Sequence, residues 1–206
     1  MNPYDRYLLP RLTHWACSSP IIDRQRKLVV PRARGRVLEI GFGSGLNLPH
    51  YTRSAVEWIW ALEPSASMRA LAAPRIAESG LDVRLLDAKA EEAPLPDACV
   101  DTAVVTFALC TIPDPLTALG HVRRLLKPDG RLLFIEHGAA PDAGVCRWQD
   151  RLNGVWRQLA GGCNLNRPIV ALLEAAGFAI SDLERAYLRH TPRIVGYVSW
   201  GAARPA

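Results

Sequence analysis

Short apolar runs alternate along this chain with segments whose apolar residues recur at helical spacing. Runs typical of buried strands lie near 36–41, 57–63, 82–87, 101–107 and 130–136. Helical patterns separate several of these runs, at about 44–51, 65–78 and 115–127. Strands that alternate with helices predict a parallel sheet covered on both faces, which is the doubly wound α/β fold class.

The helix at 115–127 has the clearest predicted boundaries. Asp114 is placed to cap its first turn, and Pro115 takes the first helical position, where no backbone N–H is needed. The sequence LKPDG, which includes residues 127–130, predicts the turn that leaves this helix.

The two ends of the chain add elements around this core. Residues 138–165 predict a long helical or irregular insert, and a helix follows at about 166–176. The last apolar segments, 178–188 and 192–202, predict a hairpin at one edge of the sheet. Two amphipathic segments, 3–15 and 20–30, have no strand partner and predict a helical lid over the open end of the sheet.

Composition indicates one globular domain. The 206 residues are 49% hydrophobic and 22% charged, which suits a single sizeable core. The net charge is +5, and the arginines that cause it are scattered and not gathered into a block. Such a surplus permits acidic partners, but codon composition explains it more simply. No aromatic-interleaved basic segment is present, so we expect no nucleic-acid partner.

The five cysteines form no CxxC pair. Their wide spacing, with no secretory signal at the start, predicts reduced thiols in a cytoplasmic protein and neither a disulfide framework nor a metal site. No apolar run approaches the roughly 18 residues that span a bilayer. We therefore expect no transmembrane segment, and peripheral membrane contact is left open.

The sharpest motif is VLEIGFGSG, at residues 37–45, where a strand enters a glycine turn. Such a turn places a ligand at the carboxyl end of the strand, and glycines allow the backbone to approach it closely. A dinucleotide fingerprint would need its third glycine at Leu46. Glu39 lies inside the apolar run, where an acid is costly unless paired or functional. Glu63 ends the next strand, where a carboxylate can accept both hydroxyls of a ribose.

Further along, the segment AEEAPLPD follows the third strand and Val100-Asp101 opens the fourth. Four features occur in order along the chain: the glycine loop, the acidic strand end, this segment and the LKPDG turn. In this order they resemble the class I S-adenosylmethionine-dependent methyltransferases across almost the whole chain. The resemblance implies that cofactor and a Rossmann-like, mostly parallel seven-stranded sheet with a C-terminal antiparallel hairpin. It also implies one domain, 1–206, whose parts are a lid (1–34), a cofactor-binding core (35–137), an acceptor-site insert (138–166), and a C-terminal helix and hairpin (167–206).

The resemblance also implies roles for residues. Glu39 would orient the ammonium end of the cofactor, and Glu63 would bind the ribose diol. Ala90 and Glu91 would bracket the adenine, although Lys89 stands where many relatives have an aspartate. Taken alone, Glu91 would be a solvated acid. The implied cofactor residues are Glu39, Gly41, Gly43, Gly45, Asn47, Glu63, Pro64, Ala90, Glu91 and Thr106.

A second set of motifs resembles a narrower group. They are NLPHY (47–51), LCT (109–111), EHG (136–138), WQ (148–149), Trp156 and GGCNLNR (161–167). This set is similar to the methyltransferase-like seven family of mammalian alkyl-thiol methyltransferases and its bacterial relatives, some of which bear the name of phospholipid methyltransferases. The mammalian proteins carry an apolar amino-terminal anchor, and the first residues of this sequence contain no comparable apolar run, so we expect no anchor.

This narrower resemblance favours methylation of a small thiol. A thiol has a reference pKa of about 8.5 and needs only modest help to ionise, and His137 is the candidate base. His137 would otherwise shape the pocket through a loop contact. Candidate acceptor-pocket residues are Cys110, Trp148, Trp156, Cys163 and Arg167. The alternatives are that the tryptophans pack the insert onto the sheet and that Arg167 caps the preceding loop. Asn166 is expected to cap the helix that begins near Arg167-Pro168.

Two other functions remain open from the sequence. One is N-methylation of a phospholipid or another amine, for which a basic surface would help docking on anionic membranes. The other, from a different class, is a cofactor-binding partner protein without catalysis of its own. An intact glycine loop together with Glu63 favours an enzyme with a small-molecule acceptor, because a protein without catalysis has no physical need for either.

Overall fold

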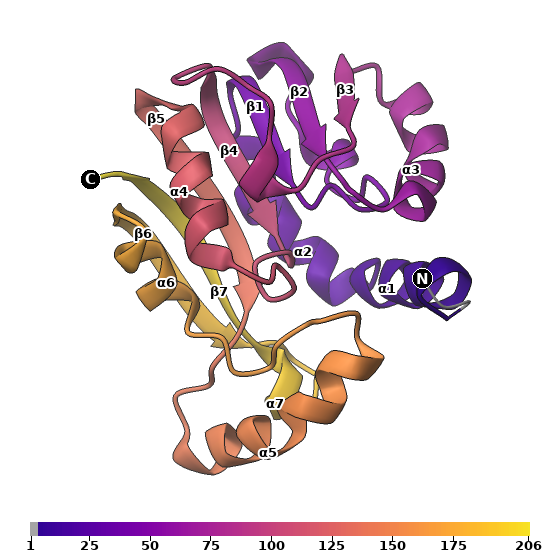
Figure 1. The fold of residues 1–206 in the computed structure, drawn as a ribbon, viewed down its shortest axis with the longest axis vertical. Helices are drawn as coiled ribbons and strands as arrows, with labels where there is room; N and C mark the ends of the chain where they lie inside the picture. The colour runs from indigo at the N-terminus through magenta and orange to yellow at the C-terminus, as the bar shows by residue number, and fades with distance from the viewer. Residues whose placement is uncertain (1–3) are drawn as a thin grey trace.

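The computed structural model describes residues 4–206, and its centre is one seven-stranded sheet (Figure 1). The strand order is β3-β2-β1-β4-β5-β7-β6. The first five strands run parallel, whereas β7 pairs antiparallel with both β5 and β6. The predicted fold class and the C-terminal hairpin are therefore confirmed. The strands are β1 (Gly35–Ile40), β2 (Val56–Leu62), β3 (Val83–Leu86), β4 (Val100–Thr106), β5 (Leu126–His137), β6 (Phe178–Tyr187) and β7 (Tyr197–Pro205).

Helices cover both faces of this sheet. The helices are α1 (Leu9–Cys17), α2 (Pro20–Val29), α3 (Ala66–Ser79), α4 (Pro115–Leu125), α5 (Ala143–Leu159), α6 (Ile169–Ala175) and α7 (Arg193–Gly196). On β1, Val37 packs in the cluster that includes residues of α2 and α3, and its neighbour Leu38 packs in the cluster with residues of α4 and α6. Because side chains alternate along a strand, a strand buried on both faces reads as a continuous apolar run.

The helix α4 begins where its sequence predicts. The Asp114 carboxylate accepts the backbone N–H of Thr117 at 3.1 Å, and the helix starts at Pro115. Its exit differs, because Leu126 already pairs with Val100 while Arg131 pairs with Thr102. Residues 127–130 thus bulge out of β5, and the strand begins four residues earlier than the apolar pattern predicts.

The predicted helix at 44–51 is wrong. The segment forms turns and one 3₁₀ turn, Leu48–His50. Gly45 has φ of +76°, outside the helical range, and the Asn47 side chain is turned inward onto Glu39. The helical periodicity of this segment is therefore overridden by side-chain hydrogen bonds to the end of β1, which determine its backbone conformation.

The insert after β5 holds α5, which lies beyond the ends of the strands and not on a sheet face (Figure 1). The helix after it starts at Ile169 without a side-chain cap, so the expected cap by Asn166 is wrong. Asn166 instead donates to the Asp150 carboxylate of α5 at 2.7 Å, because the helix begins too far along the chain for it to reach. Within residues 4–206, no helix is long and apolar enough to cross a membrane.

Candidate active site

A cavity of about 720 Å³ lies at the carboxyl ends of β1, β2 and β4. Parallel strands bring their carboxyl ends to one edge, so segments distant in sequence share its wall. The wall is formed by α1, by the glycine turn after β1, by Glu63–Ser65 after β2, by 88–91 after β3, by 106–113 after β4, and by the chain around the end of α5.

The glycine turn presents bare backbone to this cavity. Gly41, Gly43 and Gly45 have φ of +65°, +58° and +76°, conformations that L side chains rarely adopt. A Cβ added at Gly41 would lie 2.5 Å from the Cβ of Ala108. A Cβ at Gly43 would meet no atom nearer than 3.8 Å, so it would project into the cavity. The turn is shaped for a ligand that touches the main chain.

Glu63 anchors the turn to the end of β2. One carboxylate oxygen accepts the backbone N–H of Gly43 at 2.8 Å, and the other accepts that of Ser65 at 2.8 Å. Burial raises the pKa of this carboxyl, and the two backbone N–H groups oppose that rise. The carboxylate is thus held in one orientation at the cavity wall, where its remaining lone pairs can accept hydroxyl groups of a ligand.

Glu39 is the centre of a buried polar network. It accepts hydrogen bonds from Asn47 Nδ2 at 2.9 Å and from the Tyr51 hydroxyl at 2.6 Å. Asn47 also donates to Thr106 Oγ1 and accepts from Arg26 Nε, each at 3.0 Å. Desolvation raises the pKa of Glu39 to about 7. The sequence indicates that Glu39 needs partners, but it does not identify Arg26 or Tyr51, although Tyr51 belongs to the NLPHY stretch.

The other expected cofactor residues also reach the cavity, with one exception. Pro64, Ala90 and Glu91 line it together with Lys89. Gly45 does not, because its α-carbon faces Leu48 and Phe42. All the other residues of the implied cofactor set lie on one continuous wall, and their roles there remain predictions.

Glu136 organises the loop after β4. Its carboxylate accepts the backbone N–H groups of Ala108 at 2.7 Å and Leu109 at 2.9 Å. This loop carries Phe107 in a left-handed conformation, with φ of +53°, at the cavity wall. Strain of this kind persists only where surrounding contacts impose it. Glu136 belongs to the EHG motif, but the sequence assigns it no role, although an acid at the end of the apolar run LLFIE gives the same signal as Glu39.

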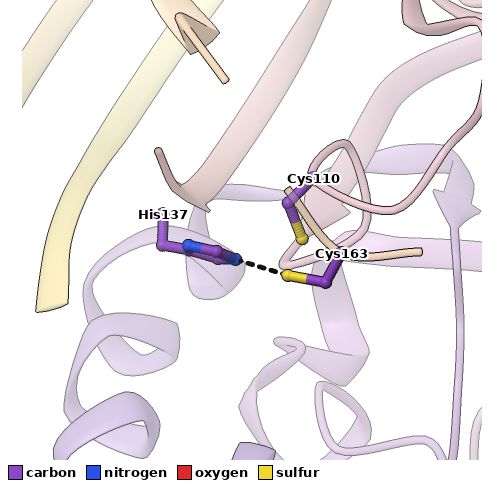
Figure 2. A group of neighbouring side chains, drawn as sticks. All are labelled: Cys110, His137 and Cys163. Atoms are coloured by element: carbon purple, nitrogen blue, oxygen red, sulfur yellow. Dashed lines mark hydrogen bonds between the residues drawn. The ribbon is translucent and has the colours of Figure 1, made fainter. Parts of the chain in front are cut away.

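Three buried side chains from separate segments meet beside this loop: Cys110 after β4, His137 at the end of β5, and Cys163 after α5 (Figure 2). His137 Nε2 lies 3.1 Å from Cys163 Sγ, and the three donor atoms lie within 4.8 Å of one another. Contact with Cys110 and burial raise the pKa of the Cys163 thiol, and the contact with His137 opposes this rise. Within the described part of the chain, no hydrogen-bond partner reaches the buried His137 Nδ1.

The expected acceptor residues do not line the cavity, nor does His137. Trp148 is 54% exposed on the outer face of α5, and Arg167 donates to the carbonyl oxygens of Leu109 and Ile112. Trp156, Cys110 and Cys163 also lie outside the lining. Helical periodicity does not say which face of α5 turns inward; the tertiary packing exposes Trp148 and brings Arg157 and Gln158 to the wall.

The lid expected from the amphipathic N-terminal segments takes part in the cavity. Leu9, Thr13 and Cys17 of α1 line it, and His14 Nδ1 lies 2.7 Å from Ser44 Oγ in the glycine turn. The Tyr4 hydroxyl donates to the carbonyl oxygen of Leu159 at 2.5 Å, which joins the lid to the end of α5. The lid therefore spans the cavity between the glycine turn and the insert.

This strand order, with a glycine turn after β1 and an acid after β2 on one cavity, is the fold of the class I methyltransferases that use S-adenosylmethionine. Residues 38–134 match the model of the methyltransferase domain family. A solved S-adenosylmethionine-dependent methyltransferase of Thermotoga maritima shares the fold, with a TM-score of 0.68 at 20% identity over 98% of each chain.

Two relatives carry specific names. Human thiol S-methyltransferase TMT1B is 32% identical over 159 residues, which is 74% of this chain and 64% of that protein. Phosphatidylethanolamine N-methyltransferase of Cereibacter sphaeroides is 32% identical over 121 residues, which is 56% of this chain and 58% of that protein. The chain thus spans less than two thirds of the length of either relative.

Proposed function

We propose that this protein transfers the methyl group of S-adenosylmethionine to a small thiol. The observation that carries the proposal is the unequal polarity of the cavity. Among its described lining residues, the carboxylates are Glu39, Glu63 and Glu91, all at the end formed by the glycine turn and the β2 and β3 loops. The end formed by 107–113 and by Arg157 to Gly162 offers no carboxylate to a cationic amine, which favours a neutral or anionic acceptor.

The glycine turn and Glu63 fit the cofactor at the other end. Gly43 leaves open cavity space beside its backbone, and Glu63 presents an oriented carboxylate to a ribose diol. When bound, S-adenosylmethionine supplies an electrophilic methyl group on a sulfonium. The chain's contribution is then alignment of the acceptor with that methyl group, because an in-line displacement depends mainly on geometry.

The loop after β4 is proposed to provide this alignment. Glu136 fixes its backbone, and Arg167 bonds to two of its carbonyl groups, so Phe107 and Thr111 are held at the acceptor end of the cavity. The base role of His137 stays a prediction. In the structure its Nε2 faces Cys163, so proton transfer from an acceptor would need that contact to open or to relay the proton.

A transfer assay with labelled S-adenosylmethionine tests this proposal. The purified protein is offered an alkyl thiol, a primary amine, a phenol, and phosphatidylethanolamine in vesicles. We expect label in the thiol product. Label only in the amine or the lipid would contradict the thiol assignment, and binding of the cofactor without transfer to any acceptor would favour the partner protein without catalysis.

A lipid-borne amine is the second candidate, and one observation favours it. The outer faces of α1 and α5 expose large apolar side chains beside the cavity, including Trp15 at 76% and Trp148 at 54% exposure. On α5 they recur at 148, 152, 155 and 159, one helical face. Exposed arginines flank them, and an interfacial helix combines these features.

A further inference from the structure

The cluster of Cys110, His137 and Cys163 has the composition of a metal site. Two thiols and one imidazole are the donors that Zn²⁺ and similar thiophilic ions prefer. With Zn–S bonds of about 2.3 Å and Zn–N bonds of about 2.0–2.1 Å, tetrahedral geometry places donor atoms roughly 3.5–3.8 Å apart. Here one separation is 3.1 Å and none of the three exceeds 4.8 Å, so small side-chain shifts would accommodate an ion (Figure 2).

Backbone contacts hold the three donors in place without any ion. Asn164, next to Cys163, bonds to the Cys110 carbonyl oxygen through its backbone N–H and its Nδ2, each at 2.8 Å. Glu136 fixes the loop that carries Cys110, and its neighbour His137 ends β5. The donor set is therefore preorganised, which lowers the entropic cost of binding a ligand.

Burial gives the cluster a reason to bind a cation. All three side chains are buried, with relative exposures of 2% for Cys110 and 9% for His137 and Cys163. Two thiolates would be costly at such a place, whereas a divalent ion would neutralise both of them and occupy His137 Nε2. The spacing of the cysteines in the sequence, which contains no CxxC pair, gives no hint of this because the donors converge only in the fold.

We propose that Cys110, His137 and Cys163 bind one thiophilic divalent ion, Zn²⁺ in the first instance, and leave its fourth position open. Among the described residues no further histidine, cysteine or carboxylate joins the group within the same distance. Three protein ligands with an open position are typical of catalytic zinc sites, whereas structural sites are closed by four. Thr111 and Gly162, the sequence neighbours of Cys110 and Cys163, line the acceptor end of the cavity, so the three ligands lie directly behind this wall.

The open position would take the acceptor's sulfur, a consequence that rests on the proposed thiol methylation. Binding to the ion releases the thiol proton to solvent and leaves the sulfur lone pair as nucleophile. A bond then forms between this sulfur and the methyl carbon, and the bond from that carbon to the sulfonium sulfur breaks. Its electron pair stays on the leaving sulfur, so no oxidant or reductant is needed.

Metal content tests the site independently of activity. The full chain is kept reduced, incubated with Zn²⁺, desalted and analysed by mass spectrometry. We expect about one zinc ion per chain, falling to about a tenth or less in Cys163→Ser and Cys110→Ser. Cys146→Ser is the matched control, because Cys146 lies on α5 and bonds to the Ala140 carbonyl oxygen instead of joining the cluster, and it should retain the ion.

Cobalt provides a second readout that needs no variant. The unsubstituted protein loaded with Co²⁺ should show thiolate-to-metal charge-transfer absorption, and added Zn²⁺ should remove it. Absence of both zinc and this absorption in the reduced protein overturns the site, as does an equal loss of zinc in Cys146→Ser. A Cys110–Cys163 disulfide that persists under reducing conditions also overturns it.

The two proposals can fail separately. If zinc binds but no thiol is methylated, the metal site is supported and the proposed thiol acceptor is contradicted. Thiol methylation at an unchanged rate after removal of zinc overturns the role of the ion in holding the acceptor. S-adenosylmethionine affinity, measured by calorimetry on each cysteine variant, confirms that the variant is folded, because the cofactor wall does not include these cysteines.

Discussion

Glu63 joins the glycine turn to the end of β2 through a single carboxylate. Replacement by alanine removes the acceptor for the N–H groups of Gly43 and Ser65 and the expected partner of the ribose. Hydrogen bonds to charged groups contribute about 1.5–3 kcal/mol each, so we expect S-adenosylmethionine to bind about 10–100 times more weakly, as measured by calorimetry. Glu57→Ala, on an exposed position of the same strand, should leave the affinity unchanged; unchanged affinity in Glu63→Ala would remove the ribose assignment.

Glu39 should make stability depend on pH. Its pKa is raised from 4.5 to about 7 by burial, so between these values the folded state keeps a proton that the unfolded state has lost. The free energy of unfolding therefore falls as pH rises through this window, by about 3 kcal/mol for this group, and is flat above it. Denaturant titrations at pH 5, 6 and 7 measure the fall.

The Glu39→Gln variant isolates this effect. An amide keeps an oxygen for Asn47 and does not titrate, so the fall between pH 5 and pH 7 should be smaller by about 3 kcal/mol than in the unsubstituted protein. Burial also raises the pKa of Glu136 to about 7. Glu136 therefore still causes the free energy of unfolding of the variant to fall as pH rises. A variant with an undiminished fall would show that Glu39 is ionised throughout.

At the level of elements, α1 is the part of the lid that touches the glycine turn. His14→Ala removes the hydrogen bond with Ser44, and a hydrogen bond between neutral groups contributes about 0.5–1.5 kcal/mol. We expect S-adenosylmethionine to dissociate about 2–10 times faster, measured by stopped-flow displacement, because the lid opens more readily. Arg11→Ala, on an exposed position of the same helix, is the control. Equal dissociation rates in both variants would contradict a gating role for this contact.

Elements with local signals were predictable, and elements held by distant side chains were not. The cap of α4 depends on Asp114 and the first turn alone, so its sequence was sufficient. The segment at 44–51 has a helical pattern, yet Asn47 and Tyr51 bind Glu39 on β1 and prevent a helix. Helix propensity is a weak predictor where a buried carboxylate needs hydrogen-bond donors from the same segment.

For the whole molecule, the exposed apolar faces of α1 and α5 predict attraction to anionic membranes. A double variant, Trp15→Ser with Trp148→Ser, should lower the fraction that sediments with phosphatidylglycerol-containing vesicles severalfold, because both exposed indoles are lost. Leu116→Ser is the matched control, since Leu116 is 46% exposed on α4, away from these helices. If neither the unsubstituted protein nor the variants sediment, these faces do not bind lipid.

The sequence by itself determined the sheet, its helical cover, the hairpin and the strand-end residues that line the cavity. Each depends on local periodicity, or on residues at strand ends that a parallel sheet must bring to one edge. Only the tertiary structure decided which face of α5 turns outward and how Glu39 and Glu136 are paired. It alone brought Cys110, His137 and Cys163 within 4.8 Å, because contacts between segments far apart in sequence depend on packing, which no local pattern encodes.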